Sequence, residues 1–300
     1  MKTLRKTTML RRMICEVPDS SRRRLRQDCV AMPGAFNAAT ARLIERAGFS
    51  AVYVSGAGLA NATAGVPDTG LLTLAEVAQL AGYIARAVKI PVLADADTGF
   101  GGLRETALAV REFERAGLAG MHIEDQVFPK RCGHLAGKEI VPVKSFCQKI
   151  RAAVRARSDP DFLIVARTDA RAAEGFDAAV QRAEAYLDAG ADAIFPEALE
   201  SEREFREFAK KIRAPLMANM TEFGRSPLLS VRRLAAMGYR MVLFPLTAFR
   251  AAMHTEAECL RDLKRRGSQR PWLPRMQTRA ELYELLGYDP KRGNVLGGGA

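Results

Sequence analysis

One thiol in this sequence lies among positive charges. Cys132 stands in the segment Lys130-Arg131-Cys132-Gly133-His134, with two cations before it and an imidazole after it. Because positive charge stabilises a thiolate relative to a thiol, we expect Cys132 to have a lowered pKa and to exchange protons near neutral pH. A solvated basic turn with an incidental cysteine would carry the same residues. The segment alone leaves both interpretations open, a catalytic acid or base and a surface turn.

Carboxylates come directly after apolar runs that have the length of buried strands. Asp95 and Asp97 follow the run 91–94, and Glu124 ends a later run. Alternation along a strand places both aspartates on one side, and hard oxygen ligands this close together favour Mg²⁺ or Mn²⁺ over zinc. The alternative is that one aspartate caps the next loop. Barrel enzymes keep their catalytic groups at strand ends, so these carboxylates favour the catalytic interpretation of the thiol segment.

A passage of helix, glycine and buried strand recurs along the chain. Each glycine can end a helix in the left-handed conformation, and an apolar run of strand length follows it. These glycines are Gly48, Gly117, Gly190 and Gly238. Together with four further apolar runs, the expected strands cover 29–32, 51–54, 91–94, 121–123, 162–166, 193–195, 215–218 and 241–244. Eight buried strands alternating with helices predict an α/β protein with a (β/α)8 TIM-type barrel. An open doubly wound sheet is the alternative, which the absence of a G-x-G-x-x-G turn after the first strand disfavours.

The two ends of the chain differ from this regular middle part. Residues 1–26 carry nine Lys and Arg against two acids, so much of the net charge of +12 lies there. We expect 1–27 to be a basic arm, flexible or loosely helical, 28–266 to be the catalytic barrel, and 267–300 to be a helical extension. Basic residues are not interleaved with aromatic ones as a base-stacking surface requires, which argues against a nucleic-acid partner.

Cysteine usage and hydropathy bear on the compartment. The five cysteines form no C-x-x-C pair and their number is odd, which favours a reducing, cytoplasmic environment over a disulfide framework. No apolar run approaches the roughly 18 residues of a membrane span. The N-terminal segment has basic residues but no apolar stretch of signal-peptide length, so we expect neither export nor membrane attachment. Its many arginines and few acids leave a mitochondrial transit peptide as an alternative.

The thiol segment is also the signature of a known superfamily. From about Pro33 to Tyr288 the chain resembles the 2-methylisocitrate lyases, members of the isocitrate lyase and phosphoenolpyruvate mutase superfamily. Seven other segments carry this resemblance in the right order. They are 53–58, 95–101, 122–126, 166–170, 195–198, 219–222 and 276–279. The resemblance implies a (β/α)8 barrel that forms a homotetramer, with the last barrel helix exchanged between subunits.

The resemblance also assigns metal ligands and catalytic groups. It places Mg²⁺, or Mn²⁺, on Asp95 and Asp97, with Asp68, His122 and Glu124 around the water shell. It implies that Cys132 is the general acid, that Tyr53 handles the hydroxyl proton of the substrate, and that His134 stabilises the carbanion. The substrate-binding positions that it implies are Ser55, Gly56, Ala57, Gly133, Arg167, Phe195, Glu197, Asn219, Thr221, Leu243, Arg250 and Arg279.

Three of these positions bear on specificity. The family usually has a third glycine where this chain has Ala57, and the methyl group is tolerable only if residue 57 does not need a positive φ. Phe195 and Leu243 match the residues that surround the extra methyl group of methylisocitrate. The implied reaction is cleavage of 2-methylisocitrate to pyruvate and succinate.

Other functions stay open at this point. Isocitrate or dimethylmalate would be cleaved by the same chemistry, and an oxaloacetate hydrolase or a phosphonate mutase would use the same barrel. From a different class, a basic nucleic-acid-binding protein on an inactive barrel is the least favoured alternative.

Overall fold

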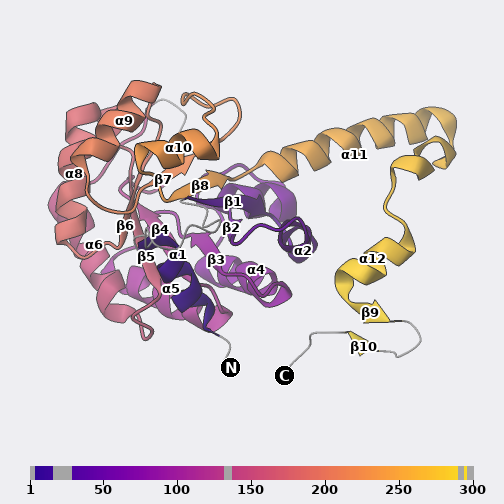
Figure 1. The fold of residues 1–300 in the computed structure, drawn as a ribbon, viewed down its shortest axis with the longest axis horizontal. Helices are drawn as coiled ribbons and strands as arrows, with labels where there is room; N and C mark the ends of the chain where they lie inside the picture. Colours follow the sequence, from indigo (N-terminus) through magenta and orange to yellow (C-terminus); the bar gives the residue numbers. More distant parts are fainter. Residues whose placement is uncertain (1–3, 16–28, 132–136, 290–293, 296–300) are drawn as a thin grey trace, which may run out of the picture.

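The computed structural model describes residues 4–15, 29–131, 137–289 and 294–295. Its centre is an eight-stranded parallel sheet with the order β6-β5-β4-β3-β2-β1-β8-β7 (Figure 1). The strands are β1 (Val30–Ala35), β2 (Val52–Val54), β3 (Val92–Asp95), β4 (Gly120–Glu124), β5 (Leu163–Thr168), β6 (Ala193–Pro196), β7 (Met217–Asn219) and β8 (Met241–Phe244). A parallel bridge between Ile194 and Leu216 joins β6 to β7, so the sheet closes on itself. This confirms the predicted barrel and the expected position of every strand.

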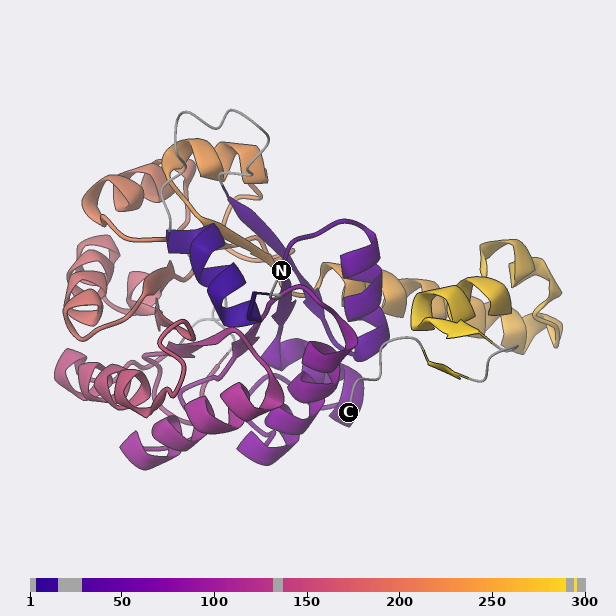
Figure 2. The ribbon, with the colours of Figure 1, turned by 60° about the horizontal axis from the view of Figure 1, so that its bottom comes forward.

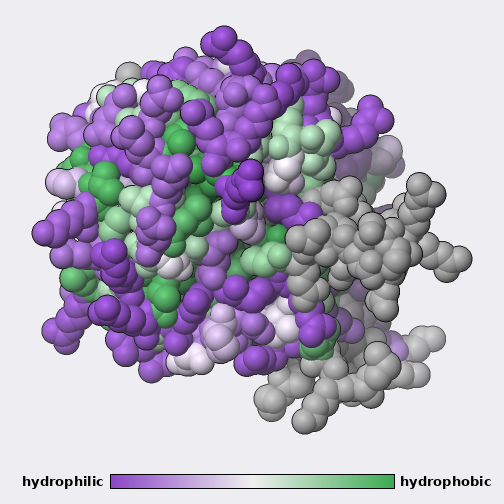
Figure 3. Space-filling view, turned by 60° about the vertical axis from the view of Figure 1, so that its left-hand side comes forward, coloured by the Kyte–Doolittle hydropathy of each residue, from purple (hydrophilic) through white to green (hydrophobic). Residues whose placement is uncertain are grey.

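Helices surround the barrel on the outside (Figure 1). The helices between successive strands are α2 (Ala38–Arg46), α4 (Leu74–Ala87), α5 (Leu103–Ala116), α6 (Val143–Ala156), α8 (Phe176–Asp188), α9 (Glu202–Lys211) and α10 (Val231–Met237). Short helical segments α3 (Gly56–Leu59), η1 (Ala60–Ala64) and α7 (Ala170–Ala173) lie in the loops after β2 and β5. Gly117 and Gly238 end α5 and α10 with φ of 87° and 102°, as the repeated pattern predicts. The side of the molecule seen in Figure 3 is mostly hydrophilic, which is expected for the outer faces of such helices.

The apolar core has two parts. The larger part fills the space between the strands and the helices, where Phe113, Phe146 and Phe208 are fully buried. The smaller part lies inside the barrel and is made of inward-facing strand residues such as Met32 and Leu93. Because alternate residues of a strand point to opposite faces, each strand supplies both parts, and its sequence reads as a continuous apolar run.

The N-terminal helix α1 (Lys6–Cys15) adds two residues to the inner core. Leu10 and Ile14 are almost completely buried and belong to the same cluster as the inward-facing strand residues. Thr8 donates a hydrogen bond to Asp161, and the Arg11 guanidinium contacts Asp192 at 2.8 Å. In Figure 2 the helix, drawn in indigo, lies in front of the strands. We expected a flexible or loosely helical arm here, and the described part of the arm is instead a packed helix. The division of the chain into three domains stays a prediction.

Removal of the α1 anchor should destabilise the whole barrel. We expect Leu10→Ala to lower the free energy of unfolding by about 2–5 kcal/mol, because the substitution leaves a cavity in the inner core. Leu4→Ala is the matched control, since Leu4 is 48% exposed and its loss should change the free energy by less than about 0.5 kcal/mol. Urea denaturation of the two variants measures both values. Equal, small changes would contradict the packing of α1.

The last barrel helix contacts its own barrel at its first turns, where the Phe249 ring lies 5.3 Å from the Phe36 ring, and then leaves it. None of the side chains of α11 (Thr247–Arg266) is buried, and the helix projects away from the strands (Figure 1). Beyond it lie η2 (Arg270–Arg275), α12 (Arg279–Leu286) and the two-residue strands β9 (Tyr288–Asp289) and β10 (Asn294–Val295). The helix α12 returns to α2, where Arg46 contacts Glu284 at 3.1 Å. No helix in the described part of the chain is long and apolar enough to cross a membrane.

Candidate active site

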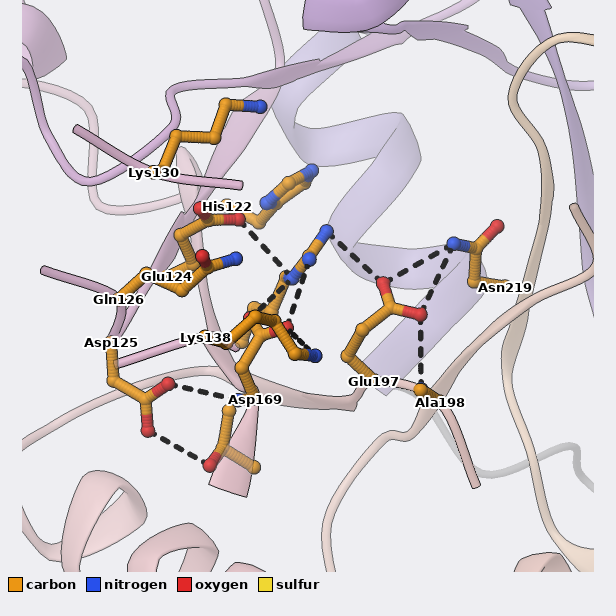
Figure 4. Close-up of polar contacts among 12 residues, drawn as sticks. His122, Glu124, Asp125, Gln126, Lys130, Lys138, Asp169, Glu197, Ala198 and Asn219 are labelled. Atoms are coloured by element: carbon orange, nitrogen blue, oxygen red, sulfur yellow. Dashed lines mark hydrogen bonds and ion pairs between the residues drawn. The ribbon is translucent and has the colours of Figure 1, made fainter. Parts of the chain in front are cut away.

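Most of the predicted site residues in the described part of the chain lie at one end of the barrel. They come from the carboxyl ends of successive strands, and because these strands are parallel their ends meet at one mouth. Tyr53 is on β2, Asp95 ends β3, His122 and Glu124 are on β4, Arg167 is on β5, Phe195 is on β6 and Asn219 ends β7. Figure 4 shows several of these side chains pointing toward one another. Cys132, Gly133 and His134 lie outside the described residues.

Asp95 and Asp97 share one small space at this mouth. The backbone N–H of Asp97 donates to Asp95 Oδ1 at 2.9 Å, and the backbone N–H of Gly56 donates to Asp95 Oδ2 at 3.3 Å. A Cβ atom at Gly56 would lie 3.0 Å from Asp95 Oδ2 and 3.4 Å from Asp97 Oδ1. Both carboxylates therefore face Gly56, and a larger residue would crowd them. Asp97 reaches this position from beyond the strand, with a left-handed φ of 46°.

A buried lysine neutralises part of this negative charge. Lys130 contacts Asp97 Oδ1 at 2.8 Å and also contacts Asp68. Burial lowers the pKa of Lys130, but the charges of Asp97 and Asp68 raise it more, so the ammonium stays charged. We expected Lys130 to act on the thiol of Cys132, whereas its contacts in the structure are with carboxylates. Its position does bring Asp68 beside Asp97, as the resemblance implies.

The acidic groups at the mouth fit a divalent cation. Burial raises the pKa of Asp97 to about 6 and raises the pKa of Glu124, with Lys130 and Arg167 opposing these shifts. Glu124 Oε1 is buried without a hydrogen-bond partner among the described residues. A bound cation would stabilise both carboxylates in their charged form.

The donor set is the one that Mg²⁺ uses. Among the described residues, no group of three or more His, Cys, Asp or Glu side chains could hold a metal by itself. Mg²⁺ commonly takes one or two protein carboxylates and completes its octahedron with water and substrate oxygens. Asp95 and Asp97 would supply the carboxylates, and Glu124 Oε1 is an acceptor available to a bound water.

Tyr53 and His122 form a neutral, buried pair. The Tyr53 hydroxyl lies 2.8 Å from His122 Nε2. Burial, together with the nearby charge of Arg167, lowers the pKa of His122 to about 3, so the imidazole is neutral. Its 3.6 Å approach to Asp95 is therefore no ion pair at neutral pH. Burial, followed by the charge of Asp95, raises the pKa of Tyr53 well above its usual value. The raised pKa keeps the Tyr53 hydroxyl protonated, so it can donate a hydrogen bond.

Arg167 is the cation at the centre of the mouth. Its guanidinium contacts Glu197 at 3.0 Å, Glu124 at 3.2 Å and Asp169 at 2.9 Å. The Phe195 ring lies beneath it, with 5.1 Å between the guanidinium carbon and the ring centroid. The Asn219 amide donates to Glu197 Oε2 at 3.2 Å (Figure 4). The site thus presents a rigid guanidinium above an aromatic surface.

The turn after β2 supplies backbone donors near the acidic pair. Ser55 caps α3, and its hydroxyl oxygen accepts a hydrogen bond from the backbone N–H of Gly58 at 3.2 Å. Ala57 is part of this helix and does not have a positive φ. The methyl group that departs from the usual glycine is therefore compatible with the backbone here.

Three predicted substrate positions lie farther from this group of side chains. Arg250 is on α11, contacts Glu222 at 3.5 Å and covers the Phe223 ring. Arg279 begins α12, and within the described part of the chain no contact joins it to the mouth. Thr221 follows β7 and is half-buried. Leu243, in contrast, is buried in β8 beside Asn219 in the strand register.

The family described as phosphoenolpyruvate phosphomutase matches residues 22–264, which span the whole barrel. The chain belongs to this family.

Relatives within the phosphoenolpyruvate phosphomutase family are close in sequence. A 2-methylisocitrate lyase of Aeropyrum pernix is 51% identical over 263 residues, covering 88% of this chain and 84% of that protein. A probable 2-methylisocitrate lyase of Corynebacterium glutamicum is 55% identical over 259 residues, which are 86% of this chain and 85% of that protein. Among solved structures, a 2,3-dimethylmalate lyase of the same superfamily superimposes with a TM-score of 0.86 at 36% identity, covering 95% and 93% of the two chains.

The structure also brings to the mouth of this family member residues that sequence reasoning did not assign. They are Asp169, which contacts Arg167, and Lys138, which contacts Asp169 at 2.6 Å (Figure 4). A signal for Asp169 was present, because alternation at the end of a strand places residues 167 and 169 on one side. Lys138 comes from a loop with no regular period, so its spacing gave no signal.

Proposed function

We propose that this protein is a carbon–carbon lyase that cleaves 2-methylisocitrate to pyruvate and succinate. The observation that carries the proposal is the pairing, at one barrel mouth, of a buried arginine with an acidic pair suited to Mg²⁺. Guanidinium binds carboxylate through two parallel hydrogen bonds, which suits a substrate with three carboxylates. Relatives with the corresponding name, up to about half identical over most of the chain, support the same substrate.

Two groups of residues would prepare the substrate. Asp95 and Asp97 would hold Mg²⁺, or Mn²⁺, and Asp68, His122 and Glu124 would surround its water shell. Bound Mg²⁺ supplies positive charge that orients a 2-hydroxy acid and favours loss of its hydroxyl proton. The backbone N–H groups of the turn after β2, at Ser55, Gly56 and Ala57, would bind a substrate carboxylate together with Gly133. Arg250, Arg279 and Thr221 are further proposed carboxylate contacts.

The remaining groups would act on the bond that breaks. When a base at the mouth takes the hydroxyl proton, the bond between carbons two and three breaks, and pyruvate is released. The other fragment keeps the electron pair, delocalised into its carboxylate, where Arg167 and His134 would stabilise it. Cys132 would then give its thiol proton to that carbon, which yields succinate. Tyr53 would hold the hydroxyl group by a hydrogen bond and handle the transfer of its proton.

Selection of the substrate would depend on two apolar side chains. Phe195 and Leu243 are both buried in the inner core of the barrel, below the polar residues of the mouth. We propose that they surround the extra methyl group of methylisocitrate. One methyl group contributes only about 1–3 kcal/mol of discrimination, so the preference over isocitrate should be incomplete.

Product identification tests this function. Purified protein with Mg²⁺ is offered 2-methylisocitrate, isocitrate, 2,3-dimethylmalate, oxaloacetate and phosphonopyruvate in separate reactions. Pyruvate and succinate from the first, with little glyoxylate from the second, is the expected result. Faster cleavage of dimethylmalate would instead favour the second candidate, which the likeness to the dimethylmalate lyase supports. Turnover of only the last two substrates would reject a lyase.

We infer that the active form is a cytoplasmic homotetramer in which α11 is exchanged between subunits. The support is that α11 buries none of its own side chains and exposes Met253, Leu260 and Leu263 to solvent in the single chain. Cys147 and Cys259, which lie in the described part of the chain, are not in a disulfide, which is compatible with a reducing compartment.

Sedimentation equilibrium tests the tetramer. A mass about four times that of the 32.8 kDa chain is expected. A monomer at micromolar concentration would contradict the exchange of α11, because the apolar side chains would then stay in water.

A further inference from the structure

A second buried lysine lies near the mouth, at Lys138, and the proposed mechanism does not use it. Its side chain is 1% exposed, and its ammonium contacts the fully buried Asp169 at 2.6 Å (Figure 4). Burying an ion pair requires the removal of both charges from water, which is unfavourable unless further hydrogen bonds compensate for it. The pair therefore needs an explanation in terms of what surrounds it.

Asp169 is held by contacts on several sides. Its Oδ2 accepts a hydrogen bond from Arg167 Nε at 2.9 Å, and its Oδ1 accepts one from Arg167 Nη2 at 3.2 Å. Its own backbone N–H donates to Asp125 Oδ1 at 2.8 Å. Asp125 in turn accepts hydrogen bonds from Thr168 and Tyr186 at 2.8 and 2.7 Å. The carboxylate of Asp169 is thus fixed in position before any ligand arrives.

The chain around Lys138 is fixed as well. The backbone N–H of Val127 donates to the Glu139 carbonyl, and that of Val141 donates to the Asp125 carbonyl, both at 2.8 Å. An antiparallel bridge joins Gln126 to Ile140. These bonds tie the segment that carries Lys138 to the residues that follow β4, so the ammonium approaches Asp169 from a rigid support.

The fixed position of Asp169 determines which N–H donors of Arg167 are occupied. Asp169 occupies the Nε and Nη2 side of its guanidinium, and Glu197 occupies Nη1 at 3.0 Å. A guanidinium has five N–H donors, so these contacts leave one donor on each terminal nitrogen. One donor on Nη1 and one on Nη2 are thus available to the two oxygens of a carboxylate. The orientation imposed by Asp169 thus sets the direction in which Arg167 can bind a ligand.

The positive charge of Lys138 offsets the carboxylates that surround Arg167. Three carboxylates, Asp169, Glu124 and Glu197, contact Arg167 within 3.2 Å. With Arg167 alone, this part of the site would repel an anionic ligand. Lys138 adds a second positive charge beside Asp169, and so reduces the repulsion without being a contact of Arg167 itself.

We propose that Lys138 and Asp169 are positioning residues, whose ion pair holds the Arg167 guanidinium so that its available donors on Nη1 and Nη2 face a substrate carboxylate. The substrate named in this inference rests on the proposed function, whereas the orientation of Arg167 does not.

The test uses two single variants and their combination in the full-length protein. Lys138→Met and Asp169→Asn should each lower kcat/KM for 2-methylisocitrate about 10²-fold, because a misplacement of about 1 Å has effects of that size. The KM should rise more than kcat falls, since Arg167 contacts the substrate before the reaction. Lys6→Met is the matched control. Its ammonium donates to the carbonyls of Ala85 and Val88, at the end of α4, at 2.6 and 2.7 Å, and its loss should leave kcat/KM within about twofold.

The double variant separates positioning from charge balance. Lys138→Met combined with Asp169→Asn removes both charges, so no buried charge is left unpaired and the fold should survive. A purely structural pair predicts that the double variant regains nearly normal kcat/KM, and that result would overturn the proposal. We expect the double variant to stay as impaired as the single ones. The reason is that Arg167 donates to two different oxygens of Asp169, whereas asparagine has an NH₂ donor in place of one of them and cannot reproduce this paired arrangement.

Crystal structures of the ligand-free wild type, Lys138→Met and double variants give a readout that is independent of activity. The Arg167 guanidinium should leave its place between residues 169 and 197 in both variants. An unmoved guanidinium would refute the proposal even if turnover is lost. If the wild type does not cleave methylisocitrate, the proposed function fails, and the crystal structures alone decide the role of the pair.

Discussion

Replacing Cys132 with serine should lower kcat by at least about 10²-fold and leave substrate binding nearly intact. General acid catalysis contributes about 10²–10⁴-fold, and it requires a group whose pKa lies near the working pH. A thiol with Arg131 and His134 close to it in the sequence can meet this condition, whereas the hydroxyl of serine is far too weak an acid. Stopped-flow or coupled assays of pyruvate release measure kcat, and calorimetry with 2-methylisocitrate measures binding.

A second cysteine provides the control for this prediction. Cys259 on α11 is partly exposed and is not placed in the site, so Cys259→Ser should keep normal kinetics. Cys147 shows why a thiol alone is not enough, because burial raises its pKa and it remains a neutral packing residue on α6. Near-normal turnover by Cys132→Ser would remove Cys132 from the mechanism and would leave the proton donor to another group.

The barrel could be predicted from sequence because its strands are buried on both faces. Runs such as Val92–Asp95 and Leu163–Thr168 are buried throughout, and glycines such as Gly117 mark the preceding helix ends. Local sequence determines both signals. The packing of α1 could not be predicted in this way, because the burial of Leu10 depends on residues from many strands that meet inside the barrel.

The part of the site that lies at strand ends could also be predicted from sequence. Residues at strand ends, such as Asp95 and Glu197, converge because parallel strands bring their carboxyl ends together. For residues on loops, no comparable regularity of the fold indicates which side chains will meet. Lys130 reaches Asp68 across 62 positions of sequence, and Lys138 reaches Asp169 across 31, so neither partner could be read from spacing.

Removal of divalent cations should abolish turnover completely. We expect an excess of chelator to stop pyruvate release, and Mg²⁺ or Mn²⁺ to restore it. The reason is that, among the described contacts of Asp95 and Asp97, Lys130 is the one strong positive charge. Calcium should restore less, since it prefers more ligands at longer distances than two carboxylates supply. Full activity in the presence of chelator would reject the metal site.

A single substitution in the acidic pair should then reduce metal binding itself. Loss of an outer-shell partner lowers metal affinity about 10–100-fold, so loss of a direct ligand in Asp97→Asn should lower it by at least that much. Titration of Mn²⁺ followed by electron paramagnetic resonance measures this affinity without any substrate. Asp177→Asn is the matched control, because Asp177 lies in the first turn of α8, outside the site, and its loss should change neither affinity nor turnover. If Asp97→Asn binds Mn²⁺ as tightly as the wild type, the carboxylates at this mouth serve the fold rather than a metal, and Lys130 alone is their physiological counter-ion.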